Sequence, residues 1–149
     1  MVYHKPSLET SMNLSMESKA VIFDSNVWIG YFNTADTTHA QAKAYFKKYN
    51  RKDIILTEYV LLEVATVLKQ KIGSAATNKI ITIVLQTENI KLLPSSEFFS
   101  ATLAKFLESK DKNLSFVDVS LAVLSSDFTV VTFDKALEAE IKQINKISR

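Results

Sequence analysis

The amino-acid sequence predicts an α/β fold layered around a mainly parallel sheet of four or five strands. Short apolar runs rich in Val, Ile and Leu alternate along the chain with longer segments in which apolar residues recur at helical spacing. These short runs are continuously apolar, which is typical of parallel strands that are buried on both faces. Strands that alternate with helices in this way indicate a layered α/β domain.

Composition sets the class of protein. The chain has 149 residues, 47% of them apolar, so one domain with a real core is expected. Cysteine is absent, which excludes a disulfide scaffold, a thiolate zinc site and a cysteine nucleophile. The net charge of +2 is too small to indicate nucleic-acid binding by itself.

The ends of the chain and its hydropathy indicate a cytoplasmic protein without a membrane anchor. No apolar run approaches the ~20 residues that a membrane-spanning helix needs. Residues 1–19 are polar, rich in Ser and Met, and lack the apolar core of a signal peptide. We therefore expect a polar N-terminal tail at residues 1–19 and a single domain at residues 20–149.

Four apolar runs are the expected strands, and Pro94 stops the third of them. The strands are predicted at 20–23, 53–57, 90–93 and 129–133, with INKIS at 144–148 as a weak fifth edge strand.

Capping residues mark the helices. Gly73 ends one helix and Ser74 opens the next, while Ser115 begins an S-x-x-D capping box. The helices are predicted at 27–32, 36–50, 58–72, 74–89, 95–110, 115–127 and 135–142.

The second of these helices is expected to be capped by Asp36 or Thr37. Its spacing predicts that Ala40, Ala44 and Tyr45 face the core.

Acidic side chains interrupt or end four of the apolar stretches. They are Asp24, Glu63, Asp118 and Asp134. A carboxylate in an apolar setting is costly unless it is paired, hydrogen-bonded or bound to a cation. Four of them in one small domain indicate a shared site, and a set of carboxylates with little else suits a hard divalent metal. Asp24 follows the first strand and Asp134 the fourth, at the edge where parallel sheets bind ligands.

Three of these acids have a plain structural alternative. Asp24 and Asp134 each separate a strand from a helix, where Asp is a common N-cap, and Asp118 completes the capping box of Ser115. Such caps contribute about 1 kcal/mol each, so any one of the three is explained as well by capping as by metal binding.

Glu63 lies in the middle of its helix and has no capping role. It lies roughly opposite the apolar face that includes Val64 and Leu68, which favours a solvent-facing glutamate. Val60 and Val67 lie one turn away on either side and narrow any solvated face, which favours a glutamate that reaches toward the strand ends. The sequence leaves both interpretations open.

Small polar residues accompany the strand-end acids. Ser25 and Asn26 follow Asp24, and Thr132 precedes Asp134 by two residues. Hydroxyl and amide groups in such places can orient metal-binding carboxylates, so Asn26 and Thr132 are the expected supporting residues.

Four segments, taken in order, resemble a PIN domain, in particular the VapC-like toxin branch of that family. They are AVIFDSNVWIGYFN, ILTEYVLLEVATVL, LSFVDVSLAVLS and VVTFDKAL. No single segment is specific, but their order and spacing are, and the resemblance covers about residues 20–148. It implies a three-layer α/β/α fold and a magnesium-dependent endoribonuclease, with Mn²⁺ as an alternative metal. It also implies a homodimer and an antitoxin partner, and RNA hydrolysis that leaves a 5′-phosphate.

The resemblance assigns roles to the acids. Asp24, Asp118 and Asp134 are the expected metal ligands, and Glu63 is a ligand or orients the attacking water. Four close carboxylates repel one another, and a bound cation removes that conflict.

Basic clusters are candidates for phosphate contacts. One is Lys43, Lys47, Lys48, Arg51 and Lys52, and the other is Lys105, Lys110 and Lys112. For any single lysine, a solvated helix face is the simpler explanation.

Other functions fit less well or remain as alternatives. A haloacid dehalogenase-type phosphatase expects a second Asp two residues after the first, where this chain has Asn26. A phosphoacceptor receiver domain expects paired early acids, which are missing. A housekeeping PIN nuclease in RNA processing and a PIN-like module that binds RNA or protein without cleavage both remain alternatives.

Overall fold

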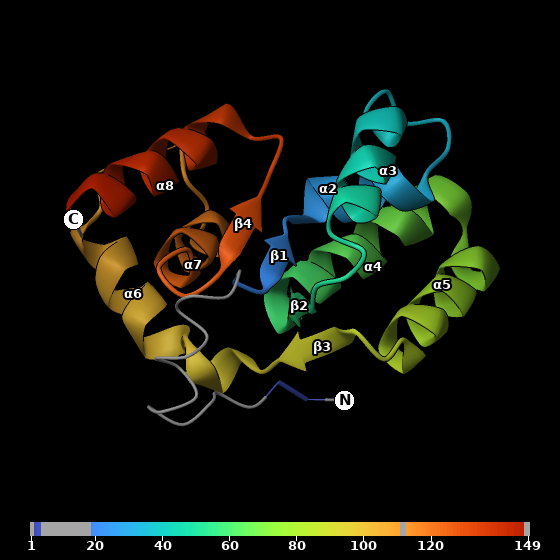
Figure 1. Cartoon of the computed structure of the whole chain (residues 1–149), viewed down its shortest axis with the longest axis horizontal. Helices are drawn as coiled ribbons and strands as arrows, with labels where there is room; N and C mark the ends of the chain where they lie inside the picture. Colours follow the sequence, from blue (N-terminus) through green and yellow to red (C-terminus); the bar gives the residue numbers. More distant parts are fainter. Residues whose placement is uncertain (1, 4–18, 111–112, 148–149) are drawn as a thin grey trace.

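The structure is a computed structural model that describes residues 2–3, 19–110 and 113–147. Helices cover both sides of one sheet, with α2 to α5 on one side and α6 to α8 on the other (Figure 1). This is the three-layer α/β/α arrangement expected from the sequence. No helix among the described residues is long and apolar enough to cross a membrane.

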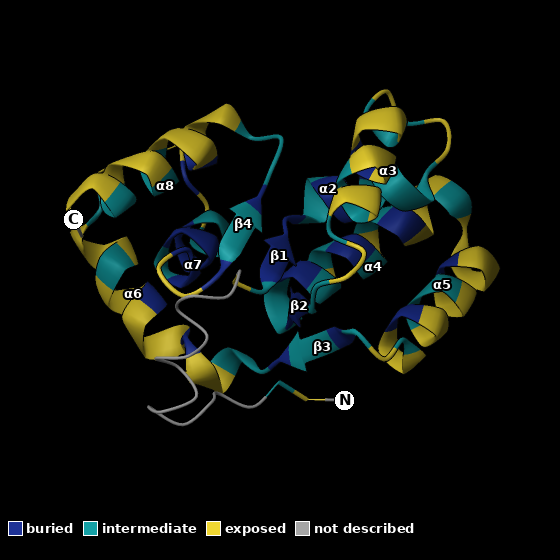
Figure 2. Cartoon of the chain, viewed as in Figure 1, coloured by how far each residue is buried: buried dark blue, intermediate teal, exposed yellow. Residues whose placement is uncertain are grey.

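The sheet is parallel throughout, with the strand order β3-β2-β1-β4. The strands are β1 (Val21–Phe23), β2 (Ile54–Thr57), β3 (Ile90–Leu93) and β4 (Thr129–Val131). The central strands β1 and β2 are buried on both faces, as their continuously apolar sequences predict (Figure 2).

The helices follow the predicted order. They are α2 (Ser25–Phe32), α3 (His39–Lys48), α4 (Glu58–Ile72), α5 (Ser74–Gln86), the 3-10 helix η1 (Ser95–Glu97), α6 (Phe99–Glu108), α7 (Phe116–Leu124) and α8 (Lys135–Ile147). Gly73 has a φ of 88° and separates α4 from α5, a conformation that favours glycine.

The strand order creates a switch point at the carboxyl edge of the sheet. The chain moves outward from β1 to β2 and β3, then crosses back to place β4 on the other side of β1. The backbone N–H of Asp24 donates to the carbonyl of Val131 at 2.9 Å, which joins the ends of β1 and β4. Residues 24–26 and 132–134, far apart in the sequence, are therefore neighbours at the place where open parallel sheets bind ligands.

The predicted fifth strand at 144–148 is wrong for the residues that the structure describes there. Helix α8 runs without a break from Lys135 to Ile147. Leu137 is buried, and Ile141 and Ile144 pack against the core, so the apolar residues follow a helical period. Ser148 lies outside the described residues.

Helix α3 begins later and faces inward differently from the prediction. The Asp36 carboxylate accepts from the backbone N–H of Thr38 at 2.8 Å and from its hydroxyl at 2.7 Å, in a turn that precedes the helix. Ala42 is the buried alanine, whereas Ala40 and Ala44 are exposed. Tyr45, the third residue of that prediction, does pack against the core. The prediction is therefore wrong for the two alanines, because α2 approaches α3 at Ala42.

Gly30 permits this close approach of α2 and α3. A Cβ atom at position 30 would overlap Oγ1 of Thr38 and lie 3.3 Å from Cβ of Ala42. The carbonyl of Gly30 also contacts Nδ1 of His39 at 2.9 Å, so His39 has a structural partner at the start of α3.

The start of the chain touches the outer edge of the sheet. Val2 forms an isolated parallel bridge with Leu92, and the backbone N–H of Tyr3 donates to the carbonyl of Leu92 at 2.9 Å. The Tyr3 ring meets the Phe128 ring edge-on with centroids 5.4 Å apart. Residues 4–18 of the predicted tail lie outside the described residues.

Gly30→Ala is expected to destabilise the protein by about 1–3 kcal/mol, because the added methyl group overpacks the α2–α3 contact. Chemical denaturation measures the change in the free energy of unfolding. In the double variant Gly30→Ala/Thr38→Ala the overlap with Oγ1 of residue 38 is absent. The effects of the two substitutions on the free energy of unfolding should therefore be non-additive. A Gly30→Ala protein as stable as the parent would contradict the close packing.

Candidate active site

Asp24 ends the central strand and is 4% exposed. It is also the N-cap of α2, where its Oδ1 accepts from the Ser25 backbone N–H at 2.7 Å. Its Oδ2 accepts from the Thr132 hydroxyl at 2.7 Å. Both carboxylate oxygens are therefore held, so the side chain has a fixed orientation at the switch point.

The Thr132 hydroxyl links the acids of β1 and β4. Besides donating to Asp24, its oxygen accepts from Nδ2 of Asn26 at 3.3 Å and from the backbone N–H of Asp134 at 3.0 Å. Oδ1 of Asn26 in turn accepts from the backbone N–H of Phe133 at 3.3 Å. One donated and two accepted bonds use the full capacity of a hydroxyl group. The structure thus gives Asn26 and Thr132 contacts of the kind expected of supporting residues.

Asp118 forms the capping box that its spacing from Ser115 predicts. Its Oδ2 accepts from the Ser115 backbone N–H at 2.9 Å, and its own N–H donates to the Ser115 hydroxyl at 3.1 Å. This cap occupies Oδ2 of the carboxylate, and Oδ1 takes no part in the capping bonds.

Asp134 also caps a helix with one oxygen. Its Oδ1 accepts from the backbone N–H groups of Ala136 at 2.8 Å and Leu137 at 3.2 Å, at the start of α8. Its Oδ2 is outside these bonds. For Asp118 and Asp134, capping and a second role for the remaining oxygen are geometrically compatible.

Glu63 is half-buried on α4, between exposed Leu62 and buried Val64. Leu62, which is 65% exposed, marks the solvent side of this turn. Helix α4 packs against α2, the helix that Asp24 caps. The sequence left open whether Glu63 faces solvent, and in the structure its side chain is neither fully exposed nor fully buried.

Electrostatics connect three of the acids. Burial raises the pKa of Asp24, and the charges of Asp118 and Glu63 raise it further, while the hydrogen bonds from Thr132 and Ser25 oppose the increase. Desolvation and like charges both penalise ionised Asp24, and a nearby cation would relieve both penalties.

The acids are gathered loosely. Among the residues described, no three His, Cys, Asp or Glu side chains lie close enough together to form a ready-made ligand set for a metal ion. The caps account for this in part, because they direct one oxygen of Asp118 to the N–H of Ser115 and one oxygen of Asp134 into the first turn of α8. The oxygen-only donor set still matches the preference of a hard cation that keeps several of its own waters.

Phe133 lies between two predicted site residues but is not singled out by the sequence analysis. Its N–H orients Asn26, and its ring lies 6.0 Å from the Tyr45 ring of α3. Its position between Thr132 and Asp134 is the feature of the sequence from which a place at the site could have been predicted. Trp28, in contrast, is 1% exposed and donates to the Phe23 carbonyl at 3.1 Å, so it belongs to the core.

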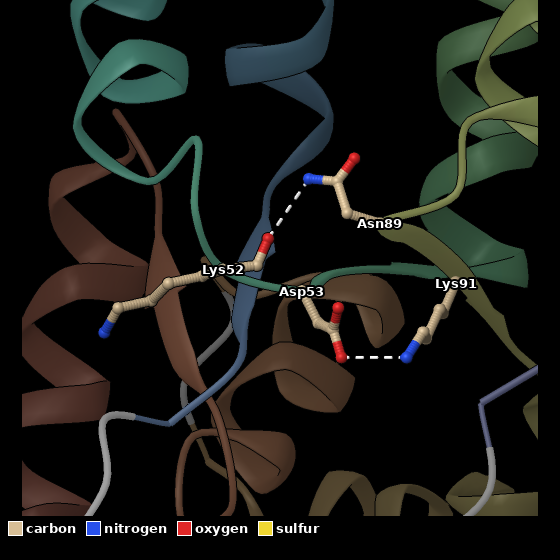
Figure 3. Close-up of polar contacts among 4 residues, drawn as sticks. All are labelled: Lys52, Asp53, Asn89 and Lys91. Carbon is tan, nitrogen blue, oxygen red and sulfur yellow. Dashed lines mark hydrogen bonds and ion pairs between the residues drawn. The ribbon is translucent and has the colours of Figure 1, made fainter.

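A polar pocket of about 320 Å³ lies at the opposite edge of the sheet, where β2 and β3 begin. It is lined by Asp53, Glu88, Asn89 and Lys91. Lys91 pairs with Asp53 at 2.8 Å, and Nδ2 of Asn89 donates to the Lys52 carbonyl at 3.2 Å (Figure 3). These groups satisfy one another and lie at the other end of the strands from Asp24.

The sequence profile of the PIN domain family matches residues 21–142. This chain belongs to the PIN domain family. All four predicted acids, together with Asn26 and Thr132, lie within the matched segment.

Among solved structures, this PIN domain is similar to VapC20 of Mycobacterium tuberculosis, a toxin described as cleaving the sarcin–ricin loop. The TM-score is 0.69 at 21% sequence identity, over 80% of this chain and 94% of that one. At this identity the match supports the shared fold. A comparison with curated protein sequences found no significant match.

The raised pKa of Asp24 predicts a pH-dependent stability term. Protonated Asp24 contributes stability that is fully present below the ordinary value of 3.8 and is lost as the pH rises through the raised pKa. In EDTA, the free energy of unfolding of Asp24→Asn relative to the parent protein should therefore increase with pH, by up to about 1.4 kcal/mol per pH unit in that window. A difference that does not change with pH would contradict the burial of an ionisable group at position 24.

Thr132→Val is expected to raise the pKa of Asp24 further, because it removes the hydroxyl that stabilises the charged form. Carbon-detected NMR titration of the Asp24 carboxyl group measures the shift. Thr132→Ser retains the hydroxyl and should leave the pKa near that of the parent. The same pKa in the Val and Ser variants would show that the bond to Asp24 is not formed.

Proposed function

We propose that this PIN domain is a magnesium-dependent endoribonuclease, with Mn²⁺ as an alternative metal, and the toxin of a toxin–antitoxin pair. The observation that carries this proposal is the buried Asp24 at the switch point, subject to the charges of Asp118 and Glu63. An ionised carboxylate in that position needs a compensating cation more than it needs a further hydrogen bond. Membership of the PIN domain family supports a nuclease as the class of enzyme.

The residues present fit a hard divalent cation. Asp24 provides a fixed carboxylate, and Asp118 and Asp134 each retain one oxygen that their caps do not use. Glu63 provides a half-buried carboxylate on α4, as a ligand or as the group that orients the attacking water. When bound, the cation supplies positive charge that lowers the pKa of water and offsets charge on the phosphodiester.

The protein's own groups then prepare the reaction. Thr132 donates to Oδ2 of Asp24, which orients the carboxylate and favours its ionised form against the effect of burial. Asn26 holds Thr132 from the other side and is itself held by the N–H of Phe133. This chain of contacts fixes β1 relative to the β4–α8 turn. Hydrolysis of the phosphodiester in this frame should leave a 5′-phosphate and a 3′-hydroxyl.

A homodimer and a cognate antitoxin complete the proposal, as the sequence resemblance to VapC-like toxins implies, and the similar structure is itself described as a toxin. The second candidate is a PIN-like module that binds RNA without cleavage. The loose gathering of the acids in the described residues is the observation that favours it.

Purified protein is expected to cleave single-stranded RNA with Mg²⁺ and to be inactive in EDTA. Asp24→Asn and Asp118→Asn should each reduce the rate by at least about 100-fold, because each removes negative charge from the metal site. Gel analysis of a labelled RNA oligonucleotide measures the rate. Asp127→Asn is the matched control, since Asp127 is exposed and precedes β4.

Two results would contradict the proposal. Full activity in Asp24→Asn would remove the site assignment. RNA binding with no metal-dependent product, under conditions where the parent protein is folded, would favour the non-cleaving module.

A further inference from the structure

The C-terminal half of α3 and the turn after it carry an uncompensated positive charge. Residues 37–52 contain five Lys and Arg and no Asp or Glu. The chain has 18 Lys and Arg against 16 Asp and Glu, and all 16 acids lie outside this segment, so the rest of the chain is net negative. The five cations, here called the α3 basic cluster, are Lys43, Lys47, Lys48, Arg51 and Lys52.

Contacts within the described residues do not neutralise the α3 basic cluster. The single ion pair among those residues joins Lys91 to Asp53, at the start of the neighbouring strands. Figure 3 shows the Lys52 side chain directed away from that pair. Lys43, Lys47, Lys48 and Arg51 are exposed, and Lys52 is partly exposed.

Helix stability alone does not account for these residues. Lys47 and Lys48 lie in the last turn of α3, where a positive charge interacts favourably with the helix dipole. However, Lys43 and Lys47 are four residues apart on one helix face, and like charges at that spacing destabilise a helix. Arg51 lies beyond the end of the helix. A polyanionic partner would reverse this repulsion.

Helix α3 lies next to the candidate active site. Tyr45 contacts Phe133, which lies between Thr132 and Asp134, with ring centroids 6.0 Å apart. Lys48 follows Tyr45 by one helical turn, and its Nζ lies 5.2 Å from the centroid of the Tyr49 ring. The same ring is 5.8 Å from Nζ of Lys52. Helix α3 thus connects the neighbourhood of the acidic edge, at Tyr45, with the start of β2, which Lys52 precedes.

We propose that the α3 basic cluster binds the phosphate backbone of the single-stranded RNA substrate and leads it toward Asp24. The RNA part of this inference rests on the proposed function. The acidic centre cannot attract RNA by charge, so the binding free energy must come from cations elsewhere. This cluster is uncompensated and begins on the helix whose Tyr45 contacts Phe133. Its lysines offer phosphate contacts without base recognition, so the surface provides affinity with little sequence preference.

The test compares two triple variants of the full chain. Lys43→Gln/Lys47→Gln/Arg51→Gln removes three exposed charges of the cluster. Lys79→Gln/Lys142→Gln/Lys146→Gln removes three exposed charges from α5 and α8. Fluorescence anisotropy with a labelled single-stranded RNA in EDTA measures Kd over a range of salt concentrations, and circular dichroism confirms that each variant is folded.

We expect the cluster variant to bind about tenfold or more weakly near 0.1 M salt. The slope of log K against log salt should become shallower by about 2, which corresponds to about 0.7 for each lost phosphate contact with single-stranded RNA. The control variant should retain the parent slope. Equal slopes in the two variants, or a parent protein that does not bind RNA, would overturn the proposal.

Two further outcomes separate this inference from the proposed function. If the cluster variant loses RNA affinity but the parent never cleaves RNA with Mg²⁺, the binding surface stands and the nuclease proposal fails. If Asp24→Asn abolishes cleavage while the cluster variant binds RNA as the parent does, the nuclease proposal stands and this inference fails. Loss of binding to poly-glutamate with unchanged binding to RNA would assign the surface to an acidic protein instead and overturn the proposal.

Discussion

The burial of one carboxylate, Asp24, at the end of the central strand is the constraint on which the site depends. A buried charge is tolerated only when its oxygens are held, and here the Ser25 N–H and the Thr132 hydroxyl hold them at 2.7 Å each. Thr132 comes from the far end of the sequence, so this requirement joins β1 to the β4–α8 turn. The parallel order β3-β2-β1-β4 makes the contact possible, because it places β4 directly beside β1.

Two of the remaining acids cap a helix with one carboxylate oxygen and leave the other oxygen outside the cap. Asp118 and Asp134 stabilise the starts of α7 and α8 with one oxygen each, and this fixes where their other oxygens can lie. Local structure and site geometry are therefore coupled, since a helix that moved would move its acid with it. Glu63 is different, because it caps no helix and its position follows from the packing of α4 against its neighbours α2, α5 and β2. The site thus combines acids that are oriented by backbone hydrogen bonds with one that is oriented by helix packing.

Charge is distributed unevenly over the molecule. The carboxyl edge of the sheet gathers acids, whereas α3, the helix in contact with Phe133, carries cations that have no carboxylate partner among the described residues. A substrate with a phosphate backbone is repelled by the first surface and attracted by the second. A cation at the acidic edge would offset the repulsion between the acids and the phosphates, since it binds both groups. In the proposed function, the fold therefore separates the surface that would bind RNA from the acids that would hold the metal.

The sequence by itself determined the features that depend on local residue patterns. Continuous apolar runs predicted the four strands, and the spacing of Ser115 and Asp118 predicted a capping box that the structure contains. It failed at 144–147 and for Ala40 and Ala44 on α3, because neither the helical period of α8 nor the approach of Gly30 to Thr38 is apparent from a short window. Only the tertiary structure decided the partial burial of Glu63 and the bond from Thr132 to Asp24. Both depend on contacts between residues distant in the chain, and strand order, which local sequence does not specify, creates those contacts.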